Sequence, residues 1–133
     1  MTIDQNKASV KKLVEGLGTN GSPEAFDLLH ENAVWTVMTD AATFPVSGDM
    51  SKPAFIEHMK RFHDSLPSGI CMSVTSVIAD EANASVEATS NALLVNGKSL
   101  NQVYHFAFEL VDGKIVAARE YIDTARALSA FSG

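Results

Sequence analysis

A chain of 133 residues is long enough for one domain with one sizeable core. Hydrophobic residues make up 46% of it and charged residues 20%, a composition that excludes a disordered chain. The net charge is −6 and no cluster of lysine and arginine forms a basic stripe, so nucleic acid is not an expected partner. No apolar run approaches the roughly 20 residues of a membrane-spanning helix, so no membrane association is expected either.

Compartment and domain count follow from a few simple features. The polar N-terminal residues contain no apolar signal-peptide core. A single cysteine, Cys71, excludes an intrachain disulfide and predicts a cytoplasmic protein, because thiols stay reduced there. Cys71 lies in the strand-like run GICMSV, so we expect a small core residue rather than a nucleophile. No repeat or linker divides the chain, so residues 1–133 are expected to form a single domain.

Helical spacing of apolar residues dominates the first half of the chain. Ser22, followed by Pro23, and Ser51 have the side chains that favour helix N-caps. Between the second and third predicted helices, the β-rich run AVWTVMT predicts a strand, and DAATFPVSGDM predicts a loop. The expected elements are a helix over 3–17, a helix over 22–31, a strand over 33–39, a loop over 40–50 and a helix over 51–66.

From residue 70 onward the apolar period changes to two, which predicts strands. Asn-Gly at 96–97 and Asp-Gly at 112–113 supply the positive φ angles of tight hairpin turns. The order α-α-β-α-β-β-β-β ends in an antiparallel meander, which is typical of an α+β domain with helices on one side of a curved sheet. The expected strands cover 70–80, 84–95, 99–110 and 114–122, and a closing helix over 123–131 is capped by Asp123 or Thr124.

Side chains alternate across a strand, so each of these strands has an inner and an outer face. The aromatic face of 99–110 and the small-residue face of 84–95 need cover, and we assign both to the helices. The more apolar face of 114–122 carries Val116, Ala118 and Ile122, and it brings one carboxylate inward with it, Glu120. The outer face then carries His105, Arg119, Tyr121 and Asp123, which we interpret as an interface or a solvated cross-strand cluster.

Three runs carry a resemblance to a known family: GSPEAFDLLHENAVWTV, SGDMSKPAFIEHM and GKSLNQVYHFAFELVDGKIVAAREYIDTARA. In this order, and over nearly the whole chain, the sequence resembles SnoaL-like polyketide cyclases of the nuclear transport factor 2-like superfamily, which also holds ketosteroid isomerase and limonene-epoxide hydrolase. The resemblance implies a cone-shaped, curved antiparallel sheet wrapped on three helices and enclosing a largely apolar pocket. It also implies a homodimer formed through the outer sheet face.

The resemblance to the epoxide hydrolases implies site positions residue by residue. Their Arg-x-Asp pair falls on Ala88 and Ser90, so both charged partners are missing here. Their last-strand acid falls on Glu120, which keeps a carboxylate one methylene longer. Their water-holding Tyr and Asn fall on Trp35 and Val37.

The resemblance to the ketosteroid isomerases is also incomplete at the site. Their base, first-helix Tyr and protonated Asp match Val37, Val14 and roughly Phe106, and none of the three is retained. Asp40 lies three residues beyond the base position and begins the predicted loop. Neither established activity is therefore assigned from the sequence, because a fold alone does not fix a function.

The predicted catalytic residues are Glu120 and Asp40. A carboxylate in an apolar pocket has a raised pKa and can exchange protons near neutral pH, but Glu120 can equally be a structural acid that is hydrogen-bonded inside the core. Asp40 either assists from the loop or is the acid of an Asx turn. The predicted ligand-binding residues, which are alternatively core residues with satisfied polar groups, are Trp35, Tyr104, Gln102, Ser90, Phe106 and Ala88.

The functional prediction is a protein that binds a small apolar molecule. As an enzyme it would perform cofactor-independent acid–base chemistry on a carbonyl- or epoxide-bearing compound, with Glu120 transferring the proton. A non-catalytic binding module and a dimeric interaction domain are the alternatives. His58 and His63 lie five residues apart and have no acid at ligand spacing, so no metal site is expected.

Overall fold

The computed structural model describes residues 2–132. These residues form one six-stranded sheet and the helices that pack on it. In chain order the elements are α1 (Ile3–Glu15), the 3-10 helix η1 (Pro23–Leu28), β1 (Leu29–Val37), β2 (Gly48–Ser51), α2 (Lys52–Asp64), β3 (Ile70–Ala79), β4 (Asn83–Leu93), β5 (Ser99–Val111), β6 (Lys114–Ile122) and α3 (Thr124–Phe131).

Each helix begins at a residue whose side chain satisfies the free N–H groups of the first turn. Thr2 forms a capping box with Gln5 at the start of α1. Ser51 accepts a hydrogen bond from the Ala54 N–H at the start of α2, and Asp123 accepts one from the Arg126 N–H at the start of α3. The helix starts predicted at Ser51 and Asp123 are therefore confirmed.

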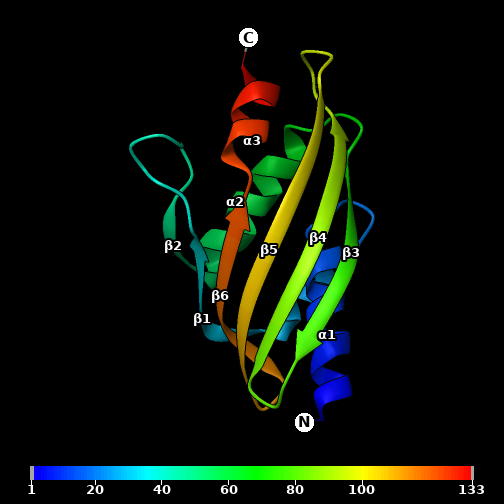
Figure 1. The fold of residues 1–133 in the computed structure, drawn as a ribbon, viewed down its shortest axis with the longest axis vertical. Coiled ribbons are helices and arrows are strands. Elements are labelled where there is room, and N and C mark those ends of the chain that lie inside the picture. The colour runs from blue at the N-terminus through cyan, green and yellow to red at the C-terminus, as the bar shows by residue number, and fades with distance from the viewer. Residues whose placement is uncertain (1, 133) are drawn as a thin grey trace.

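The strand order is β2-β1-β6-β5-β4-β3, and the sheet is curved and does not close. Figure 1 shows α1 and α2 behind one face of the sheet, with α3 beyond the end of β6. The predicted α+β architecture is confirmed. The pair β1–β6 is parallel, whereas each of the other pairs within residues 2–132 is antiparallel. The sheet is thus mixed. Strand β1 lies beside β6 and runs in the same direction, which two strands connected by a short hairpin cannot do.

Two predictions in the N-terminal half are wrong. The helix expected over 22–31 ends at Leu28, and β1 begins at Leu29 rather than at residue 33. Leu29 is buried and pairs with Ile115 of β6, so a partner 86 residues away overrides the local helical pattern. The loop expected over 40–50 is also too long, because its end forms β2, a short edge strand that pairs with the second half of β1.

The predicted inner faces of β4 and β5 are confirmed, with Phe106 and Phe108 almost fully buried. At the start of β6 the prediction is wrong: Ile115 is buried, and Val116 is displaced where the register between β5 and β6 shifts at a bulge. From Ala118 onward the predicted alternation holds. The expectation for Cys71 is also wrong, because this thiol is exposed on the outer face of β3.

The main core lies between the inner sheet face and the two longer helices. Helix α1 buries Val10, Leu13 and Val14 at helical spacing, and α2 buries Phe55 and Met59. Within residues 2–132 no helix is long and apolar enough to span a bilayer. The core ends toward α3, where a cavity replaces close packing.

Candidate functional site

A cavity of about 430 Å³ lies between the inner sheet face, α2, α3 and the loop before β2. Leu128 and Phe131 of α3 line it while remaining about half exposed, so the cavity reaches the surface beside α3. Its size is within the usual range of small-molecule sites. Fourteen apolar and five polar residues line it: Leu17, Val37, Phe44, Pro45, Val46, Met59, Phe62, Ile70, Met72, Leu100, Ile122, Ala127, Leu128 and Phe131, with His58, Gln102, Tyr104, Glu120 and Ser132.

Glu120 is the carboxylate of this cavity. Its strand, β6, lies between β1 and β5, where Glu120 pairs with Val37 on one side and Phe106 on the other. One carboxylate oxygen, Oε1, accepts a hydrogen bond of 2.9 Å from the indole N–H of Trp35. The other oxygen has no partner among residues 2–132, so it is free to meet a molecule in the cavity.

Trp35 is held rigidly behind the carboxylate. Its ring stacks on Phe55 with centroids 3.9 Å apart, and Phe106 and Phe108 meet it edge-on. The indole is buried and is only a donor, so it needs an acceptor inside the protein. Glu120 supplies that acceptor, and the stacked rings fix the direction from which the bond comes.

Burial raises the pKa of Glu120 from its ordinary 4.5 to about 7, and the hydrogen bond from Trp35 partly opposes the rise. Desolvation dominates because the walls around the carboxylate are mostly apolar. At neutral pH the side chain therefore exists in both protonated and ionised forms. A group in this state can both give and take a proton.

Tyr104 lies next to Glu120 on the inner face. It pairs with Ile122, two residues beyond Glu120 on β6, which makes the two side chains diagonal neighbours. Burial raises the pKa of Tyr104 to about 12, the hydrogen bond to Ser90 lowers it, and the charge of Glu120 raises it. The phenol is therefore a stable donor, and its oxygen is 2.9 Å from the Ser90 hydroxyl.

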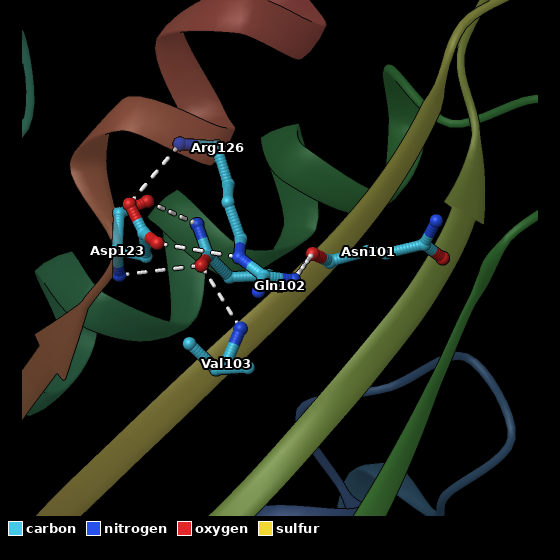
Figure 2. Close-up of polar contacts among 5 residues, drawn as sticks. All are labelled: Asn101, Gln102, Val103, Asp123 and Arg126. Carbon is cyan, nitrogen blue, oxygen red and sulfur yellow. Dashed lines mark hydrogen bonds and ion pairs between the residues drawn. The ribbon is translucent and has the colours of Figure 1, made fainter.

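Gln102 lines the cavity, but its amide is occupied by the protein. Its Nε2 donates to the Asp123 carbonyl at 2.8 Å, and its Oε1 accepts from the N–H groups of Val103 and Asp123 at 2.9 and 3.2 Å. Figure 2 shows these bonds joining β5 to the start of α3, with Arg126 bonded to Asp123 beside them. Gln102 therefore anchors the start of α3, the helix that forms one wall of the cavity.

Comparisons by sequence find no relatives: no protein-family model matches the chain, and no curated protein matches it significantly. Solved structures do match. One is an NTF2-like protein of unknown function from Burkholderia pseudomallei, with 16% identity, 97% of this chain and 98% of that chain covered, and a TM-score of 0.79. The chain has the nuclear transport factor 2-like fold.

Two further matching structures carry functional descriptions of their own. A putative SnoaL-like polyketide cyclase from Jannaschia sp. is 14% identical, with 99% of this chain and 94% of that one covered and a TM-score of 0.80. An LEH-like epoxide hydrolase from M. tuberculosis is 16% identical, with 96% and 90% covered and a TM-score of 0.71. The resemblance inferred from the sequence is confirmed at the level of the fold; at these identities it extends no further.

The other predicted site residues lie outside the walls of the cavity in this NTF2-like fold. Ala88 and Phe106 are core residues, and Ser90 is buried behind Tyr104. Asp40 is exposed, and its carboxylate accepts the Ala42 N–H at 2.9 Å in an Asx turn. The loop that follows Asp40 does reach the cavity, but through apolar side chains.

His58 is one of the polar cavity residues that sequence reasoning missed, and Ser132 is the other. His58 lies on α2, three residues after Phe55 and four before Phe62, so a signal existed: it shares the apolar stripe of the helix. Burial, with a smaller effect of the nearby Arg61 charge, lowers the pKa of His58 below its ordinary value. Within residues 2–132 no group of three or more His, Cys, Asp or Glu side chains is arranged to hold a metal ion.

Proposed function

We propose that the protein binds a small, mainly apolar molecule in the cavity and performs acid–base chemistry on it with Glu120. The observation that carries the proposal is a single carboxylic acid, held by one hydrogen bond from Trp35 and with a pKa of about 7, in an otherwise largely apolar wall. The similar structures described as a polyketide cyclase and an epoxide hydrolase support a carbonyl- or epoxide-bearing compound as the class of substrate.

The proton transfer that this arrangement supports is simple. The ionised Glu120 takes a proton from the carbon next to a carbonyl group, and the electrons of the broken C–H bond move to the carbonyl oxygen. Tyr104 donates a hydrogen bond to that oxygen while its own oxygen accepts one from Ser90. Protonated Glu120 then returns the proton to another carbon conjugated with the enolate, and the carbonyl group re-forms. In a compound that also carries an epoxide, the enolate carbon can instead bond to an epoxide carbon while the C–O bond there breaks, and Glu120 gives its proton to the released oxygen. This chemistry needs no cofactor.

A non-catalytic binding module is the second candidate. It is favoured by one observation: Glu120 is the one carboxylate that lines the cavity within residues 2–132. The resemblance to the epoxide hydrolases, which matches their charged pair to Ala88 and Ser90, agrees with it. In that case the hydrogen bond between Trp35 and Glu120 serves only to satisfy the indole N–H, and the cavity holds its ligand unchanged.

Exchange of hydrogen for deuterium at the activated carbon of the bicyclic ketone β-tetralone separates the two candidates. We expect the wild type to accelerate exchange in D₂O, followed by NMR, and Glu120→Gln to abolish the acceleration while still binding the ketone, since Gln keeps an acceptor for Trp35. Glu109→Gln, a carboxylate of the outer face, is the control. Acceleration that survives in Glu120→Gln, or binding without acceleration by the wild type, overturns the catalytic proposal.

We also propose that the protein forms a homodimer through the outer sheet face and resides in the cytoplasm. Large apolar side chains on that face support the first point: Val103, Tyr121 and Leu93 are each about half exposed. A single cysteine supports the second. Ion pairing of Arg119 with Glu109 at 2.8 Å, on the same face, supplies a polar rim of the kind that interfaces carry.

A further inference from the structure

His58 stands apart from the other three histidines. His63 bonds the Leu17 carbonyl at 2.7 Å, His30 accepts the Asn32 N–H at 3.0 Å, and His105 is bonded to Ser85. His58 is half-buried and lines the cavity, yet neither of its ring nitrogens has a hydrogen-bond partner among residues 2–132. Neither nitrogen is fully buried, so both are accessible to a molecule in the cavity and can form hydrogen bonds with it.

Two of the other polar groups of the cavity are already engaged by the protein. Gln102 uses its amide on Asp123 and Val103, and the Ser132 hydroxyl donates to the Ser129 carbonyl. Glu120 and Tyr104 meet the cavity from neighbouring positions on β6 and β5. His58 meets it from α2, which is a separate wall. The cavity therefore has two polar centres on different elements, with apolar side chains making up the rest of its lining.

The charges around these centres restrict the ligand further. No lysine or arginine lines the cavity within residues 2–132. Arg61, one turn from His58, is exposed and lies 3.6 Å from Glu57. A ligand with a permanent negative charge would find no cation to pair with, and Glu120 would repel it. A neutral imidazole offers one donor and one acceptor, which suits a hydroxyl or carbonyl group.

We propose that His58 is a ligand-binding residue that selects uncharged molecules with a second oxygen-bearing group, placed apart from the group that meets Glu120. The proposal rests on the proposed function in one respect, that the cavity binds a small molecule. It does not depend on whether Glu120 then transfers a proton.

The test compares β-tetralone with a set of hydroxy-β-tetralones that carry the hydroxyl at different ring positions. Trp35 is the single tryptophan and is bonded to Glu120, so its fluorescence reports binding. We expect the wild type to bind at least one hydroxylated compound about fivefold more tightly than β-tetralone, the gain of one hydrogen bond. His58→Phe should lose this preference while its affinity for β-tetralone stays within about twofold.

Two controls make the result specific. His58→Gln keeps a donor and an acceptor, so it should retain the preference, and it covers the case in which His58→Phe does not fold. His30→Phe makes the same change at an exposed position outside the cavity and should behave as the wild type. In ¹⁵N NMR spectra of the wild type, the ring nitrogens of His58 should shift with the preferred hydroxylated compound more than with β-tetralone.

The outcomes separate this inference from the proposed function. A wild type that binds β-tetralone and all the hydroxylated compounds equally, or a His58→Phe variant that keeps the preference, overturns the role of His58 alone. A wild type that binds none of them overturns both. Binding with the expected preference but without deuterium exchange supports His58 and removes the catalytic role of Glu120.

Discussion

Glu120 and Trp35 are 85 residues apart in the sequence, yet one hydrogen bond of 2.9 Å joins them. Two opposing effects act on the carboxyl group: burial disfavours its charge, and the indole N–H stabilises that charge. Burial prevails because one neutral donor replaces only part of the hydration that an ionised carboxylate loses. The residue is therefore expected to weaken the fold wherever it is ionised, which is a common property of functional groups.

The pH dependence of stability tests this directly. Because the pKa of Glu120 is about 7 in the folded protein and near 4.5 when unfolded, the folded state holds the proton over that window. Stability should therefore fall as pH rises from about 4.5 to 7. Between pH 5 and pH 8 the wild type should lose on the order of 2 kcal/mol more than Glu120→Gln in urea denaturation.

Glu31→Gln, an exposed carboxylate of β1, is the matched control and should change with pH as the wild type does. Parallel curves for the wild type and Glu120→Gln over this range would show that Glu120 titrates as an ordinary glutamate, and the acid–base proposal would fail with it.

How far the sequence predicts the site depends on the kind of element. Period-two alternation is enough to predict that Glu120 points to the inner face, because a side chain on a strand can point to only one of the two faces of the sheet. The direction of His58 depends on how α2 rotates against the sheet, which its apolar stripe defines only within a broad arc. The role of Gln102 was not predictable, because the bonds that hold α3 join it to backbone groups of Asp123, the N-cap of that helix, 21 residues later.

At the scale of elements, α3 is attached to β5 by two different kinds of contact. Inside, Gln102 makes its bonds to Asp123 and Val103 (Figure 2). Outside, the exposed Arg126 pairs with Asp123 and donates to the Asn101 carbonyl at 3.0 Å. Buried hydrogen bonds are costly to leave unmade, whereas exposed ion pairs contribute little. The inner contact should therefore decide whether α3 stays closed over the cavity.

Replacing the buried amide tests that ranking. Gln102→Leu should destabilise the protein by about 2–4 kcal/mol, since it leaves the Asp123 and Val103 backbone groups without partners. Hydrogen exchange followed by mass spectrometry should show faster exchange in α3 than in α1. Arg126→Gln should cost less than about 1 kcal/mol. Equal effects of the two substitutions, or unchanged exchange in α3, would contradict this account.

Elements with local signals were predicted well. The caps at Ser51 and Asp123 and the hairpin turns of the meander depend on neighbours in the sequence, so local chemistry is sufficient. The start of β1 at Leu29 and the whole of β2 depend on strand partners elsewhere in the chain. Exposure of Cys71 follows from the register of β3, which a short apolar run does not define.

At the scale of the whole molecule, the two faces of the sheet differ in kind. The inner face covers the core and the cavity. The outer face carries polar side chains interspersed with large apolar ones, among which Val103 lies near the middle of β5. A sheet with one covered face normally presents a mostly polar surface to water, so the large apolar side chains on the outer face are what the proposed dimer would cover.

A charge placed on that face should separate the proposed dimer. Val103→Glu is expected to shift the protein from dimer to monomer in sedimentation velocity, because an unpaired carboxylate would be buried in the interface. Val95→Glu makes the same change in the turn after β4, where the side chain is 82% exposed, and should leave the dimer intact. Affinity for β-tetralone should be equal in both variants. A wild type that sediments as a monomer would refute the dimer.

The parallel pairing of β1 with β6 has a consequence for the order of folding. The hairpins of β3 to β6 close short loops, but β1 meets β6 only after the chain has closed a loop of more than 80 residues. Before that pairing we expect Glu120 to lie on an edge strand, with water on one side and no indole beside it. The raised pKa of this carboxyl group should therefore develop late in folding, and its titration would report when β1 joins the sheet.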